Sequence, residues 1–244
     1  MLTASSDPPC VSLEPHLEMA YNTQYPQKVF FFCRSAPLSD EGGETPIVDM
    51  RDFHLALPSA MVDKLKAVGV KYSRRLPSAA AAPGQIYTWQ ALFFSEEQLE
   101  VEARCEELGY AFSWGEDGSL SWSYVRPAFV QHTPGGPECW FNQATCLHHS
   151  YYNEYPGGSV DQPVEESIPI LPGNMQPHDT CYGDGTAFSC EDVQFMRARL
   201  WERASAVTWS TGDMLVMDNT RVAHGRMSYT ETSQRSILVS LAGH

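Results

Sequence analysis

Features that mark several common protein classes are scarce in this sequence of 244 residues. Only 16 residues are Lys or Arg against 30 Asp or Glu, and the net charge of −14 excludes the clustered basic surface that nucleic-acid binding requires. The strongest apolar run, Val29 to Cys33, is far shorter than the roughly 18 residues of a membrane-spanning helix. The expected partner is therefore a small molecule, not nucleic acid or a membrane.

The seven cysteines are an odd number without paired spacing, which predicts free, mostly buried thiols in a reducing, intracellular compartment. Met1 to Pro9 lacks the charged and apolar parts of a signal peptide, so a cytoplasmic location is expected. An organelle-targeting segment upstream of Met1 is the alternative, because part of the N-terminal sequence is expected to be missing. Neither a Gly-x-Ser-x-Gly elbow nor a phosphate loop occurs, so no motif favours a serine hydrolase or a nucleotide-binding protein. The oligomeric state cannot be derived from these features.

What is present predicts one globular domain over residues 1–244, because 43% of the residues are hydrophobic and 244 residues can bury a full core. Strands are expected at both ends of the chain: Gln27 to Cys33, Met214 to Met217, and from Arg235 onward. Helices are expected between them: Pro58 to Gly69, Ser95 to Leu108, and a third that follows a cap at Ser189. This order predicts an α+β protein with a mostly β core, built on a sandwich or barrel with flanking helices.

Residues 151–188 are rich in Pro, Gly and Tyr and show no sustained periodicity. An irregular segment of this length inside a domain is often a lid or a binding loop. It is therefore predicted to be a substrate loop, and the identity of the substrate cannot be derived without its shape.

Three residues form a candidate metal site. His16 and Glu18 are two positions apart, so on a strand both would project from one face. His224 follows a short apolar strand and a polar turn near the other end of the chain. Two imidazoles and one carboxylate on one side of an ion are typical of non-haem Fe(II) oxygenases. A His-x-Glu pair alone is more often a solvated or hydrogen-bonded feature, and a zinc hydrolase with the same three ligands also stays open.

Arg235 would share a strand face with Ile237, Val239 and Leu241. An unpaired buried guanidinium costs several kcal/mol, so Arg235 should lie at the solvated end of the strand or bind an anion. A carboxylate co-substrate suits it, because the guanidinium can donate two parallel hydrogen bonds. Arg226 is expected either to assist that co-substrate or to pair with Asp218.

Three blocks occur in order: His16-Leu-Glu18-Met-Ala, Gly42-Gly-Glu-Thr45-Pro-Ile-Val, and Gly212 to Arg226 with Arg235 beyond it. Over nearly its whole length the chain resembles the taurine dioxygenase and clavaminate synthase-like (TauD/TfdA-like) family of Fe(II)/2-oxoglutarate oxygenases. The resemblance implies a double-stranded β-helix, or jelly roll, in which His16, Glu18 and His224 bind Fe(II). It also implies 2-oxoglutarate held by Arg235 and Thr45, and O2 as the oxidant.

The implied reaction oxidises a small molecule, in the simplest case by hydroxylation, while 2-oxoglutarate is converted to succinate and CO2. Glu18 points to the clavaminate-like branch, because the taurine branch carries Asp at this position. Val239 stands where taurine dioxygenase has a second Arg, so a sulfonate is not the expected substrate. Asn142, beside two aromatic residues, is a candidate substrate contact, with a position at the edge of the core as the alternative.

The start of the chain is short for the resembling family, in which a substantial segment precedes the His-x-Glu motif. Only fifteen residues precede His16 here, so part of the family's N-terminal region is expected to be missing. A version extended upstream should then be more stable and more active. The alternative to an oxygenase is a non-catalytic jelly-roll binding module or an inactive fragment.

A second group of metal-capable residues, Cys139, Cys146, His148 and His149, has a spacing that matches no zinc pattern. These residues are expected to belong to a strand that passes into a loop, without a metal.

Overall fold

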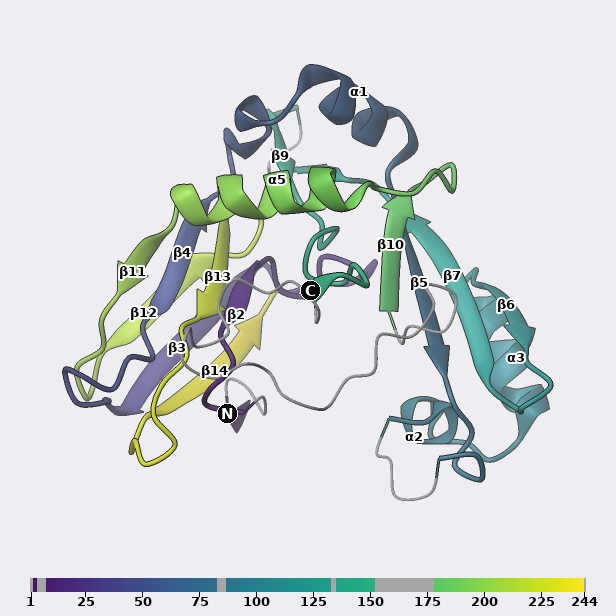
Figure 1. Cartoon of the computed structure of the whole chain (residues 1–244), viewed down its shortest axis with the longest axis horizontal. Coiled ribbons are helices and arrows are strands. Elements are labelled where there is room, and N and C mark those ends of the chain that lie inside the picture. The colour runs from purple at the N-terminus through teal and green to yellow at the C-terminus, as the bar shows by residue number, and fades with distance from the viewer. Residues whose placement is uncertain (1, 4–7, 83–86, 133–134, 152–177, 244) are drawn as a thin grey trace.

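The computed structural model describes residues 2–3, 8–82, 87–132, 135–151 and 178–243 (Figure 1). The chain is mostly β, with few helices. Its elements in chain order are β1 (Leu2–Thr3), β2 (Leu13–His16), β3 (Lys28–Ser35), β4 (Thr45–Asp49), η1 (Phe53–Ala56), α1 (Ser59–Val68), β5 (Val70–Leu76), α2 (Trp89–Phe93), α3 (Gln98–Glu107), β6 (Ala111–Trp114), β7 (Leu120–Arg126), β8 (Phe129–Gln131), β9 (Glu138–Trp140), β10 (His178–Tyr182), α5 (Cys190–Glu202), β11 (Ser205–Val207), β12 (Met214–Asp218), β13 (Val222–Arg226) and β14 (Ser236–Ala242).

Two antiparallel sheets of four strands form one half of the molecule. The first has the order β1-β14-β3-β12 and the second the order β11-β4-β13-β2. Alternation along β3 buries Val29, Phe31 and Cys33 on one face, as expected for a period of two. These side chains share an apolar cluster with Ile47 of β4 and Val222 of β13. The two sheets therefore face each other across a common core.

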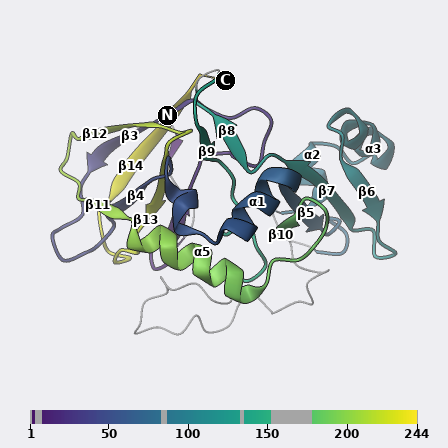
Figure 2. The same cartoon turned by 90° about the horizontal axis from the view of Figure 1, so that it is seen from above.

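A third sheet, with the order β10-β5-β7-β6, lies at the other end of the long axis, next to α2 and α3 (Figure 1). Seen from above, α1 and α5 lie beside each other between the two halves (Figure 2). One apolar cluster joins Val48 and Ala223 of the second sheet to Leu65 of α1, Met196 of α5 and Tyr72 of the third sheet. The halves thus share a continuous core, in keeping with the single domain, which stays a prediction.

The expected helices are present, but one start was predicted wrongly. Ser189 caps α5, because its hydroxyl accepts a hydrogen bond from the Asp192 amide at 3.0 Å. The helix predicted from Ser95 starts later: α3 begins only at Gln98, after Glu97. The Ser95 hydroxyl accepts a hydrogen bond from the Glu97 amide and donates one to the side chain of Glu100. It therefore stabilises the turn that precedes α3. No helix in the described ranges combines the length and apolar character needed to cross a bilayer.

The predicted loop 151–188 falls largely on residues 152–177, which lie outside the described residues. Its last part is not irregular: His178–Tyr182 forms β10 and pairs antiparallel with β5. This part of the prediction was wrong because the strand is stabilised by a partner more than a hundred residues earlier in the chain, not by a local pattern.

Candidate metal centre

His16 and His224 are brought together by strand register. The two residues are directly paired between β2 and β13, and their ring centroids are 4.6 Å apart. His224 is buried and its ring packs edge-on against Phe31 of the first sheet, with centroids 5.1 Å apart. Both imidazoles therefore belong to the face of the second sheet that looks toward the first.

Glu18 reaches the same place by a different route from the one predicted. β2 ends at His16, and Glu18 lies in the turn that follows, so alternation along a strand does not position it. Asn219, which is fully buried, holds the turn: its side-chain oxygen accepts from the Glu18 amide at 2.7 Å, and its nitrogen donates to the Glu18 carbonyl at 2.8 Å. The convergence was predicted and Asn219 was not, because its only signal in the sequence is membership of a polar turn.

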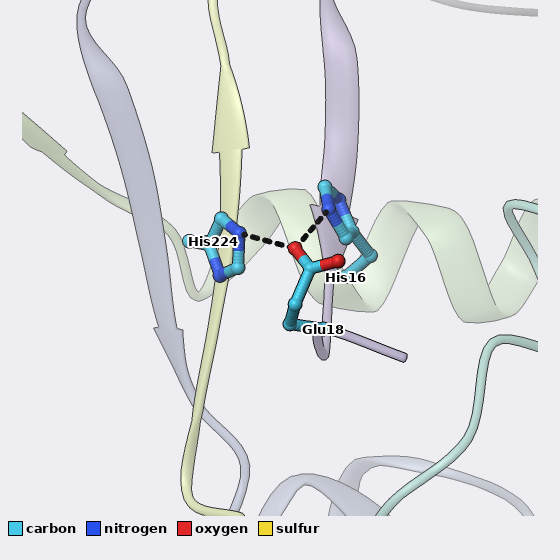
Figure 3. Close-up of side chains that lie close together, drawn as sticks. All are labelled: His16, Glu18 and His224. Carbon is cyan, nitrogen blue, oxygen red and sulfur yellow. Dashed lines mark ion pairs between the residues drawn. The ribbon is translucent and has the colours of Figure 1, made fainter. Parts of the chain in front are cut away.

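The ligand atoms of the three residues face one another (Figure 3). Oε2 of Glu18 lies 3.8 Å from Nε2 of His16 and 3.5 Å from Nε2 of His224. One ligand atom from each residue lies within 4.8 Å of the other two. Nδ1 of His16 donates to the Glu14 carbonyl at 2.9 Å, so Nε2 is the ring nitrogen that is directed at the Glu18 carboxylate and is free to bind a metal.

The protonation states also suit a metal. Burial lowers the pKa of His224 below its usual value, which favours the neutral imidazole that a metal needs. Burial alone would raise the pKa of Glu18, but the His224 hydrogen bond and the two imidazoles outweigh it, so the pKa is lowered. Nδ1 of His224 is buried without a hydrogen-bond partner among the described residues, so the protein fixes the tautomer of His16 only. Two imidazoles and one carboxylate form a ligand set that fits Fe(II).

Thr45 and Arg235 lie near each other at one end of this site. Thr45 is buried at the start of β4, two residues from Ile47, which pairs directly with His224. Nε of Arg235 donates to the Gly43 carbonyl at 2.8 Å, and its guanidinium lies 5.1 Å from the centre of the Tyr229 ring. Burial lowers the pKa of Arg235, because lost hydration disfavours its charged form. The Arg235 guanidinium therefore sits close to Thr45 and is suited to an anion.

The hydroxyl of Thr45 already accepts a hydrogen bond from Nε1 of Trp209 at 3.1 Å. This leaves its proton available for donation to a ligand. Trp209 lies shortly before the Gly212 to Arg226 block, but its contact with Thr45 depends on tertiary structure.

Asn142 is buried, and its amide bonds to the backbone: nitrogen donates to the Ala128 carbonyl at 2.9 Å and oxygen accepts from the Ala144 amide at 3.0 Å. Its side chain borders a cavity of about 10 Å³ beside His16, with room for no more than a water molecule. These contacts agree with the core-edge alternative, and substrate contact by Asn142 stays a prediction.

His148 and His149 do converge with a carboxylate, that of Asp179, which the sequence pattern had not indicated. Oδ1 of Asp179 is already bound by N–H donors, from Nδ1 of His149 at 2.9 Å and from the Thr180 amide at 2.9 Å. Nδ1 of His148 accepts from the Ser150 amide at 3.2 Å, which places the proton of the neutral ring on Nε2, toward Asp179. His148, His149 and Asp179 thus form a hydrogen-bonded network.

The predicted pairing of Arg226 with Asp218 is wrong. Arg226 donates to the carbonyls of Pro8 and Val11 at 2.7 and 2.5 Å and so fixes the start of the chain against β13. Asp218 pairs with Lys28 at 3.0 Å instead, because the register of β12 with β3 sets these two residues opposite each other.

A site of two histidines and one carboxylate between facing antiparallel sheets is typical of non-haem Fe(II) oxygenases. The family model described as "Taurine catabolism dioxygenase TauD, TfdA family" matches residues 3–241, and the chain belongs to this family. The membership places it among the Fe(II)- and 2-oxoglutarate-dependent dioxygenases and confirms the resemblance seen in the sequence.

Two curated relatives are similar along the chain. The dapdiamide synthesis protein DdaC of Enterobacter agglomerans is 29% identical over 240 residues, which cover 98% of this chain and 68% of that protein. A clavaminate synthase-like protein of Arabidopsis thaliana is 28% identical over 254 residues, covering 99% of this chain and 68% of that protein. The chain thus spans about two thirds of either relative.

Among solved structures, asparagine oxygenase in complex with Fe(II), hydroxyasparagine and succinate matches with a TM-score of 0.52 at 13% identity. The match covers 96% of this chain and 50% of that one. PvcB from Pseudomonas aeruginosa matches with a TM-score of 0.50 at 11% identity, over 96% of this chain and 57% of that one. These likenesses support the fold.

Proposed function

We propose that this chain oxidises a small molecule, in the simplest case by hydroxylation, with Fe(II), 2-oxoglutarate and O2, and releases succinate and CO2. The observation that carries the proposal is the convergence of His16, Glu18 and His224 in a family-typical order, with Arg235 and Thr45 beside them. The first and second sheets would then be the two halves of a double-stranded β-helix. A metal hydrolase with the same three ligands would leave Arg235 and Thr45 without a role.

The residues have separate tasks in this mechanism. His16, Glu18 and His224 would hold Fe(II), which supplies the redox chemistry when bound. Arg235 would bind the distal carboxylate of 2-oxoglutarate through the guanidinium nitrogens that Gly43 does not occupy. Thr45, anchored by Trp209, would donate its hydroxyl proton to the same co-substrate. Apolar neighbours such as Phe31 restrict water around His224.

The remaining expectations are part of the same proposal. The net charge of −14 supports a small molecule over nucleic acid as the substrate. The seven cysteines are all free, which supports a reducing, intracellular location. Val239 is half-buried against the apolar core of the first sheet and carries no charge, which supports a substrate other than a sulfonate.

The test is anaerobic binding of Fe(II) and 2-oxoglutarate, followed by the weak visible charge-transfer band of their complex. His16→Ala and His224→Ala should each abolish the band, because each deletes one of three protein ligands. His132→Ala is a matched control, since His132 bonds to Thr220 and is not one of the three. A band of full strength in either ligand variant would remove that residue from the metal site.

A further inference from the structure

Arg74 lacks the partner that a half-buried guanidinium normally has. It forms no hydrogen bond or ion pair with any described residue, and its Nε is buried without an acceptor. Its one contact of note is with the Trp122 ring, 5.6 Å from the guanidinium carbon. A cation over an aromatic ring at this distance recovers less free energy than the desolvation of the charge costs.

The next residue, Arg75, shows the usual arrangement on the opposite face of β5. Its guanidinium donates to Asp117 at 2.6 Å and to Ser119 at 3.2 Å. Arg75 shares its face with Ser73, Ser121 and Ser123, and these residues line a cavity of about 450 Å³ on the third sheet. Among the described residues, Arg75 has an anionic partner and Arg74 has none, so the two arginines differ in their pairing.

The face that carries Arg74 continues toward the metal centre. Tyr72 shares this face by alternation along β5, and its ring lies 6.5 Å from that of Tyr21. Tyr21 follows Glu18 by three residues in the same turn region. The negative charge of Glu18 contributes to raising the pKa of Tyr21 after burial, while the charge of Arg74 opposes it, so Tyr21 senses both groups. Tyr21 therefore lies within electrostatic range of both Arg74 and the metal ligand Glu18.

The other neighbours of Arg74 do not neutralise it. His178 pairs directly with it across β10 and β5. Burial, helped by the charge of Arg74, lowers the pKa of His178 to about 4, so this ring is neutral near pH 7. Trp122 faces Arg74 from β7. In the described part of the chain, the guanidinium is thus set among aromatic and neutral groups that could hold the organic part of a ligand.

We propose that Arg74 binds a carboxylate of the substrate that is oxidised at the His16–Glu18–His224 centre. The inference rests on the proposed function and adds the substrate class: a small carboxylic acid whose charged group lies on the third sheet, while its reacting carbon lies at the metal centre. The guanidinium fork matches a carboxylate, and the Trp122 ring beside it supplies apolar surface. Arg235 would bind 2-oxoglutarate, and Arg74 would bind the substrate.

The experiment uses the full chain loaded with Fe(II) and 2-oxoglutarate under anaerobic conditions. The probes are N-acetyl-L-amino acids, each tested beside its uncharged N-acetyl-L-amino acid amide, so that every pair differs in charge and little in shape. Binding is measured as the rise in thermal midpoint across a concentration series, and O2 is then admitted to measure probe-dependent succinate formation.

In the wild-type chain, at least one acid should bind and stimulate succinate formation at least tenfold better than its amide. Arg74→Gln should weaken that acid by about 10- to 100-fold and remove the preference, while Arg74→Lys should keep part of it. Arg75→Gln is the matched control, with the same loss of charge on the same strand, and should keep the preference. The affinity of Arg74→Gln for 2-oxoglutarate should equal that of the wild type, which also shows that the variant is folded.

Three results would overturn the proposal: acids and amides that bind the wild type equally, no acid that binds it, or a preference that survives in Arg74→Gln. A wild-type chain without the Fe(II)/2-oxoglutarate band would count against the proposed function separately. The acid–amide comparison by thermal midpoint would still test Arg74 in that case.

Discussion

Arg197→Met should destabilise the chain by about 3–5 kcal/mol, the usual cost of breaking a buried ion pair by removing one partner. Nε of Arg197 lies 3.0 Å from Oε2 of Glu14, and the two side chains are 3% and 0% exposed. The other guanidinium nitrogens donate to the Ser150 hydroxyl at 3.0 Å and the Thr145 carbonyl at 2.8 Å. The substitution keeps most of the apolar volume but leaves a carboxylate in the core without its cation.

The same change should weaken the metal centre. Glu14 lies in β2, two residues before His16, and its carbonyl accepts the hydrogen bond that orients the His16 ring. Loss of Arg197 should shift this part of β2, because the carboxylate will move toward water. Loss of an interaction that orients a metal ligand typically costs about 10- to 100-fold in metal affinity, and this is the expected range for Fe(II).

The assay is urea unfolding of the metal-free chain, so that bound metal does not contribute to stability. Arg199→Met is the matched control on the same helix. Arg199 pairs with Glu202 at 2.5 Å, with the side chains 35% and 53% exposed, so a loss of about 0–1 kcal/mol is expected. Glu14→Gln combined with Arg197→Met should recover part of the loss, because no buried charge remains. The reasoning is refuted if Arg197→Met loses no more stability than Arg199→Met, or if the double variant is no better than the single one.

Further predictions concern the co-substrate and pH. Arg235→Lys should lose about 1.5–3 kcal/mol of 2-oxoglutarate binding free energy, which is the range for a hydrogen bond to a charged group, while iron binding should change little. An unchanged affinity for 2-oxoglutarate in calorimetry would contradict this role of Arg235. Gly43→Ala should have a similar effect, because Gly43 has φ +84° and a Cβ there would lie 2.6 Å from Cδ of Arg235. Gly135→Ala is the control for backbone strain, because Gly135 has φ +75° and no described atom within 4 Å of the added Cβ. Equal 2-oxoglutarate affinity in the two variants would contradict the steric argument. Burial lowers the pKa of both His148 and His178 to about 4, against 6.5 when exposed. The unfolded chain therefore binds more protons between these values, and stability should fall as the pH drops from 6.5 toward 4. Urea unfolding at several pH values should show a shallower slope in His178→Gln, and an unaltered slope would exclude His178 as a contributor.

Local pattern determined much of this protein. The alternation in Val29 to Cys33 defined the buried face of β3, and the helical spacing of Met61, Val62 and Leu65 defined α1. The order of motifs around His16 and His224 was enough to indicate the family, which the family model confirmed, while the metal ligands stay a prediction. Such features follow from the sequence because alternation, helical spacing and motif chemistry involve only residues near one another in the chain.

Tertiary structure decided the features that depend on distant partners. Glu18 was expected on a strand, yet a turn positions it, and the turn is held by Asn219, 201 residues away. Register between β2 and β13 aligns His16 with His224, and no local pattern encodes which strands will pair. The difference between Arg74 and Arg75, adjacent and identical in type, became visible only once their neighbours were known. The sequence determines which side chains are charged. Whether a charge is paired with an opposite charge depends on which groups folding brings within a few ångströms of it.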